Sequence, residues 1–270
     1  MPGHAESAQS GPMPLDPSVA HVARVYDYWL GGKDNFAADR EAAELAIAAN
    51  PGIRASARAN RAFLARSVRY LAAECGVRQF LDIGTGLPTA ANTHEIVQAV
   101  APECRVVYVD NDPVVLLHAR SRLASDPAGA AAYVEADLRD TGRILTEAAR
   151  TLDFSRPVSV LLLLILHLIP DADDPYRIVG ELMAATAPGS FLVLTHVATD
   201  IEAEAMAEMA KCLNRLVAQK GTTRTKAEVT AFFQGLALAE PGVVPPQLWR
   251  PERPVSRASV PAWCGVARKE

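Results

Sequence analysis

The chain has 270 residues, half of them hydrophobic, and a formal net charge of -4. A chain of this length can bury a large core, so we expect one main domain with additions. The acidic balance excludes nonspecific nucleic-acid binding as its main role, because no overall basic field would attract a phosphate backbone.

The cysteines and the apolar runs indicate the cellular compartment of the protein. The four cysteines stand far apart, with neither a CxxC pair nor metal-ligand spacing: Cys75, Cys104, Cys212 and Cys264. The longest apolar run, residues 158–169, is shorter than the roughly 20 residues that span a bilayer. We therefore expect a reduced, cytoplasmic protein without a membrane segment, and we interpret this run as a buried strand.

The first part of the chain is predicted to be helical after a flexible tail. Residues 1–17 are rich in Pro, Gly, Ser and Ala without an apolar period, which is typical of a loose tail. "VARVYDYWL" has helical spacing that stops at Gly31 and Gly32. Further helices are predicted over residues 39–49 and 53–75, and residues 18–77 together form a predicted helical cap on the core.

From residue 78 to residue 270 the pattern alternates between strands and helices. The predicted strands include "QFLDIG", "RVVYVD", "AAYVEAD", "VSVLLLLILHLI" and "SFLVLTHV". Short apolar strands alternating with helices predict a parallel sheet with helices on both faces. Two late segments, residues 236–248 and "AWCGVARK", are predicted to close the sheet as an edge hairpin.

The loop "LDIGTGLPT" follows the first predicted strand. Gly84 and Gly86 suit a dinucleotide turn, but Thr89 stands where that pattern requires a further glycine or alanine. Asn92 and Glu95 have the spacing of a capping box, so the next helix is predicted to begin at Asn92. The loop is therefore longer than a dinucleotide turn, and an NAD-dependent dehydrogenase is disfavoured.

Carboxylates end three predicted strands: Asp82, Asp110 and Asp137. Each alone could be an ordinary strand-end cap. Together they line the carboxyl edge of the sheet, where open α/β sheets bind ligands, and Asp110 has the spacing of a carboxylate that accepts bonds from ribose hydroxyls. The combination predicts a nucleoside-containing cofactor.

These segments carry a family resemblance. "FLDIGTG", "VVYVDNDPVVLLHARSRL" and "VEADLRD" resemble motifs I to III of class I S-adenosylmethionine-dependent methyltransferases. More narrowly, "RVYDYWLGGKDNF", "RANRAFL", "GLPTAANTHE", "LHLIPDADDP" and "EPGVVPPQLWRP" resemble a bacterial S-adenosyl methyltransferase family, over about residues 19–268. The resemblance implies a Rossmann-like, mostly parallel seven-stranded sheet with helices on both faces, an added N-terminal helical segment, and S-adenosylmethionine as cofactor.

The resemblance also implies roles for individual residues. Near the methionine part and ribose of the cofactor it places Asp82, Gly84, Thr85 and Gly86. Asp110 would hold the ribose hydroxyls, with Asn111 beside the adenine, and Asp137 and Leu138 would meet the adenine amino group and ring. In the "RAN" segment, Arg58 and Asn60 are the better candidates for the methionine carboxylate or an acidic acceptor, within a row of arginines that could instead be solvated.

Histidines supply candidates for the chemistry. His167 follows the buried strand at the edge where the methyl group would lie, so it is a candidate general base or acceptor-orienting group. The alternative is that His167 only caps the strand end. His196 is expected to be structural. His94 could face the cofactor or be exposed, and we expect it to be exposed.

The segment before the sheet contributes candidates for recognition. In "VYDYWLGGKDNF", Tyr26 is a candidate for the cofactor site, and Lys33 and Asn35 are candidates for the substrate site. The alternative is an amphipathic helix that packs its aromatic residues into the core.

The acceptor is predicted only as a class. "LHLIPD" lacks the Asp/Asn-Pro-Pro-aromatic arrangement associated with methylation of base amino groups, so a small molecule becomes the expected acceptor, without nucleic-acid or membrane partners. We expect in-line methyl transfer to its oxygen, nitrogen or carbon. The alternative is a binding protein that senses S-adenosylmethionine or its demethylated product.

Overall fold

The computed structural model describes residues 16–88, 91–115, 117, 127–217, 219–254 and 260–270. Most of the predicted tail, residues 1–15, lies outside the described residues.

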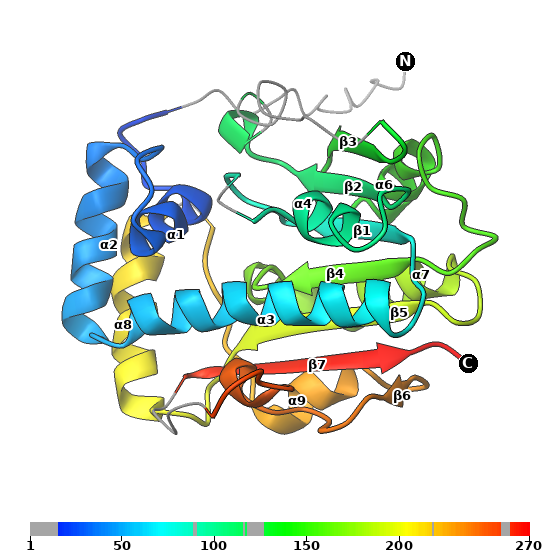
Figure 1. The fold of residues 1–270 in the computed structure, drawn as a ribbon. Coiled ribbons are helices and arrows are strands. Elements are labelled where there is room, and N and C mark those ends of the chain that lie inside the picture. Colours follow the sequence, from blue (N-terminus) through cyan, green and yellow to red (C-terminus); the bar gives the residue numbers. More distant parts are fainter. Residues whose placement is uncertain (1–15, 89–90, 116, 118–126, 218, 255–259) are drawn as a thin grey trace, which may run out of the picture.

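A single seven-stranded sheet forms the centre of the protein (Figure 1). Its strands are β1 (Gln79–Ile83), β2 (Arg105–Asp110), β3 (Ala130–Glu135), β4 (Ser159–Leu163), β5 (Phe191–Val197), β6 (Ala237–Leu238) and β7 (Ala262–Arg268). Their order is β3-β2-β1-β4-β5-β7-β6, in which the first five are parallel and β7 is antiparallel to β5. The predicted Rossmann-like sheet and its edge hairpin, β6 with β7, are confirmed.

The strand order indicates where a ligand site is expected. β1 pairs with β2 on one side and with β4 on the other, so the chain direction across the sheet reverses at β1. Ligands of open α/β sheets bind outside the carboxyl ends of the strands at this switch point.

Helices cover both faces of the sheet. The α-helices are α1 (Val22–Leu30), α2 (Ala37–Ala49), α3 (Ile53–Ala73), α4 (Thr93–Gln98), α6 (Thr141–Ala148), α7 (Pro175–Ala184), α8 (Ala203–Leu216) and α9 (Lys226–Ala231). Short 3-10 helices span Leu166–Leu168, Asp171–Asp173 and Pro246–Leu248. The predicted glycine stop after α1 is confirmed, because Gly31 has the left-handed φ of 85° and its N–H bonds to Tyr28 O.

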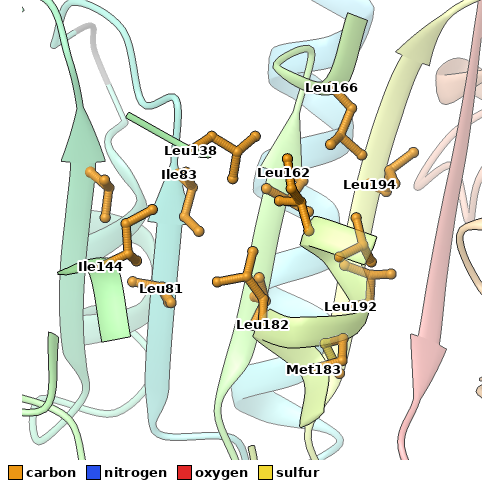
Figure 2. Packing of buried hydrophobic residues seen from close by; sticks show 14 of the residues in the cluster. Leu81, Ile83, Leu138, Ile144, Leu162, Leu166, Leu182, Met183, Leu192 and Leu194 are labelled. Carbon is orange, nitrogen blue, oxygen red and sulfur yellow. The ribbon is translucent and has the colours of Figure 1, made fainter. Parts of the chain in front are cut away.

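Strand periodicity divides the core between the two faces. Leu81 and Leu162 point to the face covered by α6 and α7, where they pack with Ile144 and Leu182 (Figure 2). Phe80, next to Leu81 in the same strand, points to the other face and packs against residues of α3 and α4. Successive side chains of a strand alternate between faces, so each apolar strand supports two core layers.

A helical layer stands at the carboxyl end of the sheet. In Figure 1, α1, α2 and α8 lie at the end toward which the arrowheads of β4 and β5 point, whereas α3 runs along the sheet. Ala46 of α2 packs with Met206 and Met209 of α8. The layer over the strand ends therefore combines N-terminal helices with one from much later in the chain. The division of the chain into a cap and a core at residue 77 stays a prediction.

The apolar run 158–169 is not one strand, contrary to expectation. β4 ends at Leu163, the backbone turns at Leu164 with φ 52°, and the 3-10 helix Leu166–Leu168 follows. Leu166 and Ile169 are buried in the core although they are outside the sheet. An apolar run indicates burial but does not distinguish a strand from a buried turn. This turn brings His167 above the carboxyl edge of the sheet.

Candidate functional site

A cavity of about 220 Å³ lies between the carboxyl ends of the strands and helices α1, α3 and α8. A smaller cavity of about 30 Å³ shares part of its lining, including Gly84 and Asp110. The larger cavity brings together these predicted site residues: Tyr26, Asp82, Gly84, Thr85, Gly86, Asp110, Asn111 and His167. Asp137 and Leu138 line the smaller one. Most candidates chosen from the sequence thus meet at one place.

The glycine loop requires its two glycines for different reasons. Gly84 has φ 73°, and a Cβ there would lie 2.6 Å from Ile165 Cγ1, so any side chain would displace Ile165. Gly86 also has a positive φ, 65°, but a Cβ there would meet nothing within 4 Å. Gly84 therefore satisfies both a backbone and a space requirement, whereas Gly86 satisfies only the backbone requirement.

Asp110 fixes the loop from the end of β2. Its Oδ2 accepts a hydrogen bond from Gly86 N at 2.8 Å, and its Oδ1 accepts one from Asp112 N at 2.9 Å. Burial raises the pKa of its carboxyl above the ordinary value. Each carboxylate oxygen has room for about two donors, so this carboxylate retains acceptor capacity at the cavity wall.

Asp82 joins the loop to the helix that follows it. Its Oδ2 accepts a hydrogen bond from Thr93 Oγ1 at 2.7 Å, and burial raises the pKa of its carboxyl to about 6. The predicted start of this helix at Asn92 is confirmed, and Asn92 N donates to Glu95 Oε2 at 2.8 Å. His94 was expected to be exposed, and this is wrong, because it is buried with Nδ1 2.7 Å from Tyr108 Oη.

The smaller cavity is bordered by polar groups from the next strand end. Asn111 Nδ2 lies 3.3 Å from Asp137 Oδ2 and donates to it. Arg139 pairs with Asp137 at 3.1 Å and with Asp173 at 2.6 Å. Leu138 is buried beside them and supplies an apolar surface. This end of the site is bordered by an apolar side chain and by amide and carboxylate groups.

A chain of hydrogen bonds crosses the wall of the larger cavity. Thr195 Oγ1 donates to Asn60 Oδ1 at 2.8 Å, Asn60 Nδ2 donates to Tyr26 Oη at 3.0 Å, and Tyr26 Oη donates to Ala57 O at 3.1 Å. It links β5, α3 and α1. The polar groups of Asn60 and Tyr26 are thus used within the protein, and they present a fixed wall to a ligand.

His167 lines the larger cavity from the turn after β4. Its backbone carbonyl accepts a hydrogen bond from Thr222 N at 2.6 Å. Its Nδ1 is buried and has no hydrogen-bond partner among the described residues. Burial, with the nearby His196 and Arg224, lowers the pKa of the imidazole to about 3. His167 is therefore neutral near pH 7.

Arg224 lines neither cavity but supports the site, and sequence reasoning missed it. Its buried guanidinium donates to Leu166 O at 3.1 Å, to Ile169 O at 3.0 Å and to Asp171 Oδ1 at 2.5 Å. It also lies 2.7 Å from His196 Nε2. It ties the turn that carries His167 to the end of β5. Its polar surroundings, "TTRTK", predict an exposed arginine, so the sequence offers no local signal for its burial.

Three predicted site residues do not reach the cavity. Arg58 is exposed and outside the lining, because Ala57, Asn60 and Arg61 present the cavity-facing side of α3. Lys33 is also exposed. The side chain of Asn35 donates to Asp27 Oδ2 at 2.8 Å and to Gly32 O at 3.1 Å, which shapes the turn after α1. The geometry does not support site roles for Arg58, Lys33 and Asn35.

The described residues hold no group of three or more His, Cys, Asp or Glu side chains placed to bind a metal ion. Among the same residues, no helix is both long and apolar enough to cross a bilayer.

The sheet order and the site define a protein class. A glycine loop after β1, facing carboxylates at the ends of β2 and β3 in a sheet with an antiparallel β7, characterises the Rossmann-like class I methyltransferases. The chain belongs to the S-adenosyl methyltransferase family, whose sequence profile matches residues 8–270. It is a methyltransferase, and the family implies that S-adenosylmethionine is its methyl donor.

Solved structures agree with this assignment. A DUF574 family protein from Streptomyces avermitilis is 42% identical, with a TM-score of 0.92 over 94% of this chain and 99% of that chain. A candidate methyltransferase from Thermobifida fusca is 44% identical, with a TM-score of 0.86 over 94% of this chain and 96% of that chain. No curated protein matches the chain at a significant level.

Proposed function

We propose that the protein transfers the methyl group of S-adenosylmethionine to a small-molecule acceptor by in-line displacement. The observation that carries the proposal is the pair of cavities that share lining at Gly84 and Asp110. One borders the glycine loop and continues toward α8, and the other is bordered by Asp137 and Leu138. The shared lining supports one extended ligand with an adenine, a ribose and an amino-acid tail.

The residues present fit this cofactor. A Cβ at Gly86 would meet nothing within 4 Å, so the loop leaves open space there, and the buried Asp110 carboxylate retains acceptor capacity for ribose hydroxyls. Asn111, Asp137 and Leu138 would surround the adenine. Asp82, Thr85 and Gly86 would lie along the methionine part and ribose. When bound, S-adenosylmethionine supplies a methyl group that is already activated on a sulfonium.

Charge at the cavity suggests how the cofactor tail is held. Arg61 lines the cavity, whereas Arg58 is exposed, so we propose Arg61 in place of Arg58 as the partner of the methionine carboxylate. Tyr26 contributes as a wall, since its hydroxyl is already bonded to Ala57 and Asn60.

The chain's own contribution is chiefly to orient the reactants and exclude water. Proximity and orientation can supply roughly 7–11 kcal/mol, whereas a general base adds about 10²- to 10⁴-fold and only when the acceptor must lose a proton. An imidazole with a pKa of about 3 is a weak base near pH 7. We therefore favour an acceptor-orienting role for His167 over general-base catalysis.

The alternative function, a sensor of S-adenosylmethionine, predicts a blocked acceptor pocket. The cavity instead continues past Gly86 to residues of α8, including Met206 and Leu213. This open space supports an enzymatic function over a sensor function.

Calorimetry tests the proposal. S-adenosylmethionine should bind and NAD should not, because the loop lacks the features that hold a pyrophosphate. Asp110→Ala should weaken S-adenosylmethionine binding by about 10- to 100-fold, the worth of hydrogen bonds to a charged group. Glu208→Gln, on the exposed side of α8, is the control and should bind normally. Tight NAD binding without S-adenosylmethionine binding would refute the proposal.

A screen with labelled methyl groups tests turnover. Extracts of small metabolites should yield a labelled product with the parent protein and less with Asp110→Ala. Binding of the cofactor without labelling across broad extracts would instead favour the sensor.

A further inference from the structure

The larger cavity contains a part whose walls carry no charge. We call it the apolar compartment, and it is lined by Trp29, Ile53, Val197, Met206, Met209 and Leu213. These side chains from α1, α3, β5 and α8 also pack with one another in one cluster. Methionine and tryptophan offer adaptable and aromatic contacts, so the compartment suits a ring-sized apolar ligand.

Three polar side chains elsewhere on the cavity wall already have protein partners. Asn214 Oδ1 accepts from Gly221 N at 2.7 Å, and its Nδ2 donates to Gly221 O at 3.2 Å. Asn60 is bonded at both ends to Tyr26 and Thr195. The Asp27 carboxylate accepts from Asp34 N and from the side chain of Asn35. These contacts use the polar groups to build the wall.

His167 differs from these groups. Its ring lines the same cavity, and a Cβ at Gly221 would lie 3.5 Å from its Cδ2, so the Asn214–Gly221 link lies against the ring. Its Nδ1 is buried without a hydrogen-bond partner among the described residues. Its Nε2 is not among the buried unpaired atoms of the described residues, so it is the ring nitrogen that a ligand in the cavity can reach, and a neutral imidazole nitrogen can accept a hydrogen bond.

We propose that the apolar compartment binds an uncharged, largely apolar small molecule whose hydroxyl group donates a hydrogen bond to the ring of His167. This inference rests on the proposed function, in which the molecule is the methyl acceptor. A charged acceptor would lose its hydration against apolar walls without gaining a partner of opposite charge. The net reaction would convert the hydroxyl compound and S-adenosylmethionine into a methyl ether, S-adenosylhomocysteine and one proton.

Three probes that share a naphthalene ring test the chemical class. A naphthol, the corresponding naphthoate and the corresponding naphthylmethylammonium are titrated into the full chain near pH 7 by calorimetry, with and without saturating S-adenosylhomocysteine. The neutral naphthol should bind at least tenfold more tightly than either charged probe. Equal or tighter binding of a charged probe, or no binding of the naphthol, would overturn the inference.

Variants on α8 locate the binding. Ala210 lines the cavity, so Ala210→Trp and the smaller Ala210→Leu should reduce naphthol affinity at least tenfold and leave S-adenosylhomocysteine affinity within about twofold. Ala207→Trp, exposed on the same helix, is the matched control and should change neither affinity. Naphthol binding that survives both Ala210 variants would place it outside the compartment and overturn the inference.

His167→Phe tests the hydroxyl contact. The parent protein should prefer the naphthol to its methyl ether, and the variant should lose this preference, because phenylalanine keeps a ring but offers no acceptor. An unchanged preference would overturn the hydrogen bond. Binding of S-adenosylhomocysteine alone tests the proposed function separately. Naphthol titrations without S-adenosylhomocysteine test the apolar compartment even if S-adenosylhomocysteine does not bind.

Discussion

At the scale of single residues, the site contains titratable groups whose environment opposes their charge. Burial raises the pKa of Asp82 to about 6 and lowers that of His167 to about 3. A carboxyl with a raised pKa binds its proton more tightly in the folded protein, so its unfavourable effect on folding develops as pH rises from about 3.8 to about 6 and is constant above that. Such perturbed groups are typical of functional sites.

Asp82→Asn should make the protein more stable near pH 7. The asparagine oxygen still accepts from Thr93, whereas the cost of a buried charge is removed, on the order of 1–3 kcal/mol for a shift of this size. Urea unfolding of both proteins should give a stability difference that grows between pH 4 and pH 6.5. A difference independent of pH would contradict this explanation.

The imidazole of His167 should not titrate in the neutral range. Its pKa of about 3 means that its NMR ring signals, assigned with the His167→Gln variant, should stay constant from pH 5 to pH 8. The folded protein binds this proton less tightly than the unfolded chain, so stability is lost as pH falls below about 6.5. A titration midpoint near 6.5 would show that the ring is hydrated.

At the scale of elements, the turn after β4 is held by contacts from distant segments. Arg224 donates to Leu166 O and Ile169 O, and Thr222 N donates to His167 O. The glycine loop after β1 packs against Ile165 of the same turn. The positions of His167 and of the loop therefore depend on each other.

Arg224→Met should destabilise the protein by on the order of 3 kcal/mol, because the carbonyls of Leu166 and Ile169 would lose charged donors in a buried place. The control is Arg215→Met, since Arg215 is exposed on α8. Urea unfolding at pH 7 measures both. Equal losses of stability in the two variants would show that Arg224 does not stabilise the turn after β4.

Gly84→Ala and Gly86→Ala separate backbone strain from lack of space. Both positions have positive φ, but only the methyl group at Gly84 meets Ile165. Gly84→Ala should therefore cost about 1–3 kcal/mol more than Gly86→Ala, the usual effect of overpacking. Urea unfolding should show this gap shrinking in an Ile165→Ala background. If the difference in stability persists in the Ile165→Ala background, the cost arises from the backbone conformation.

At the scale of the whole molecule, the cavity lies between parts of the chain that are distant in sequence. Its lining includes Val25 of α1, Leu64 of α3, Gly84 after β1 and Met209 of α8. A ligand that fills it contacts the sheet edge and the helices over it at once. Binding should therefore stabilise the entire fold.

S-adenosylhomocysteine at about 100 times its dissociation constant should add roughly 2.7 kcal/mol to the free energy of unfolding. A thermal melt followed by circular dichroism should move upward as a single transition, and NAD at the same concentration should leave it unchanged. Asp110→Ala serves as the control, because its response to the same ligand concentration should be smaller. Stabilisation by NAD alone would contradict the proposed site.

The sequence by itself determined the features that depend on neighbouring residues. The alternation of apolar segments indicated the sheet, Gly31 indicated the end of α1, and Asn92 with Glu95 indicated the start of α4. The strand-end position of Asp110 and Asp137 followed from the same local patterns. These signals are short-range, because periodicity, capping and backbone conformation are set within a few residues.

Only the tertiary structure decided the rest. The burial of Arg224 and His94, the outward direction of Arg58 and the packing of α8 against α2 arise from contacts between distant segments. The local sequence of a polar or alanine-rich stretch does not indicate which of its faces another helix will cover. The sheet edge and its cofactor class were therefore readable from the sequence, whereas the walls of the apolar compartment were decided by packing.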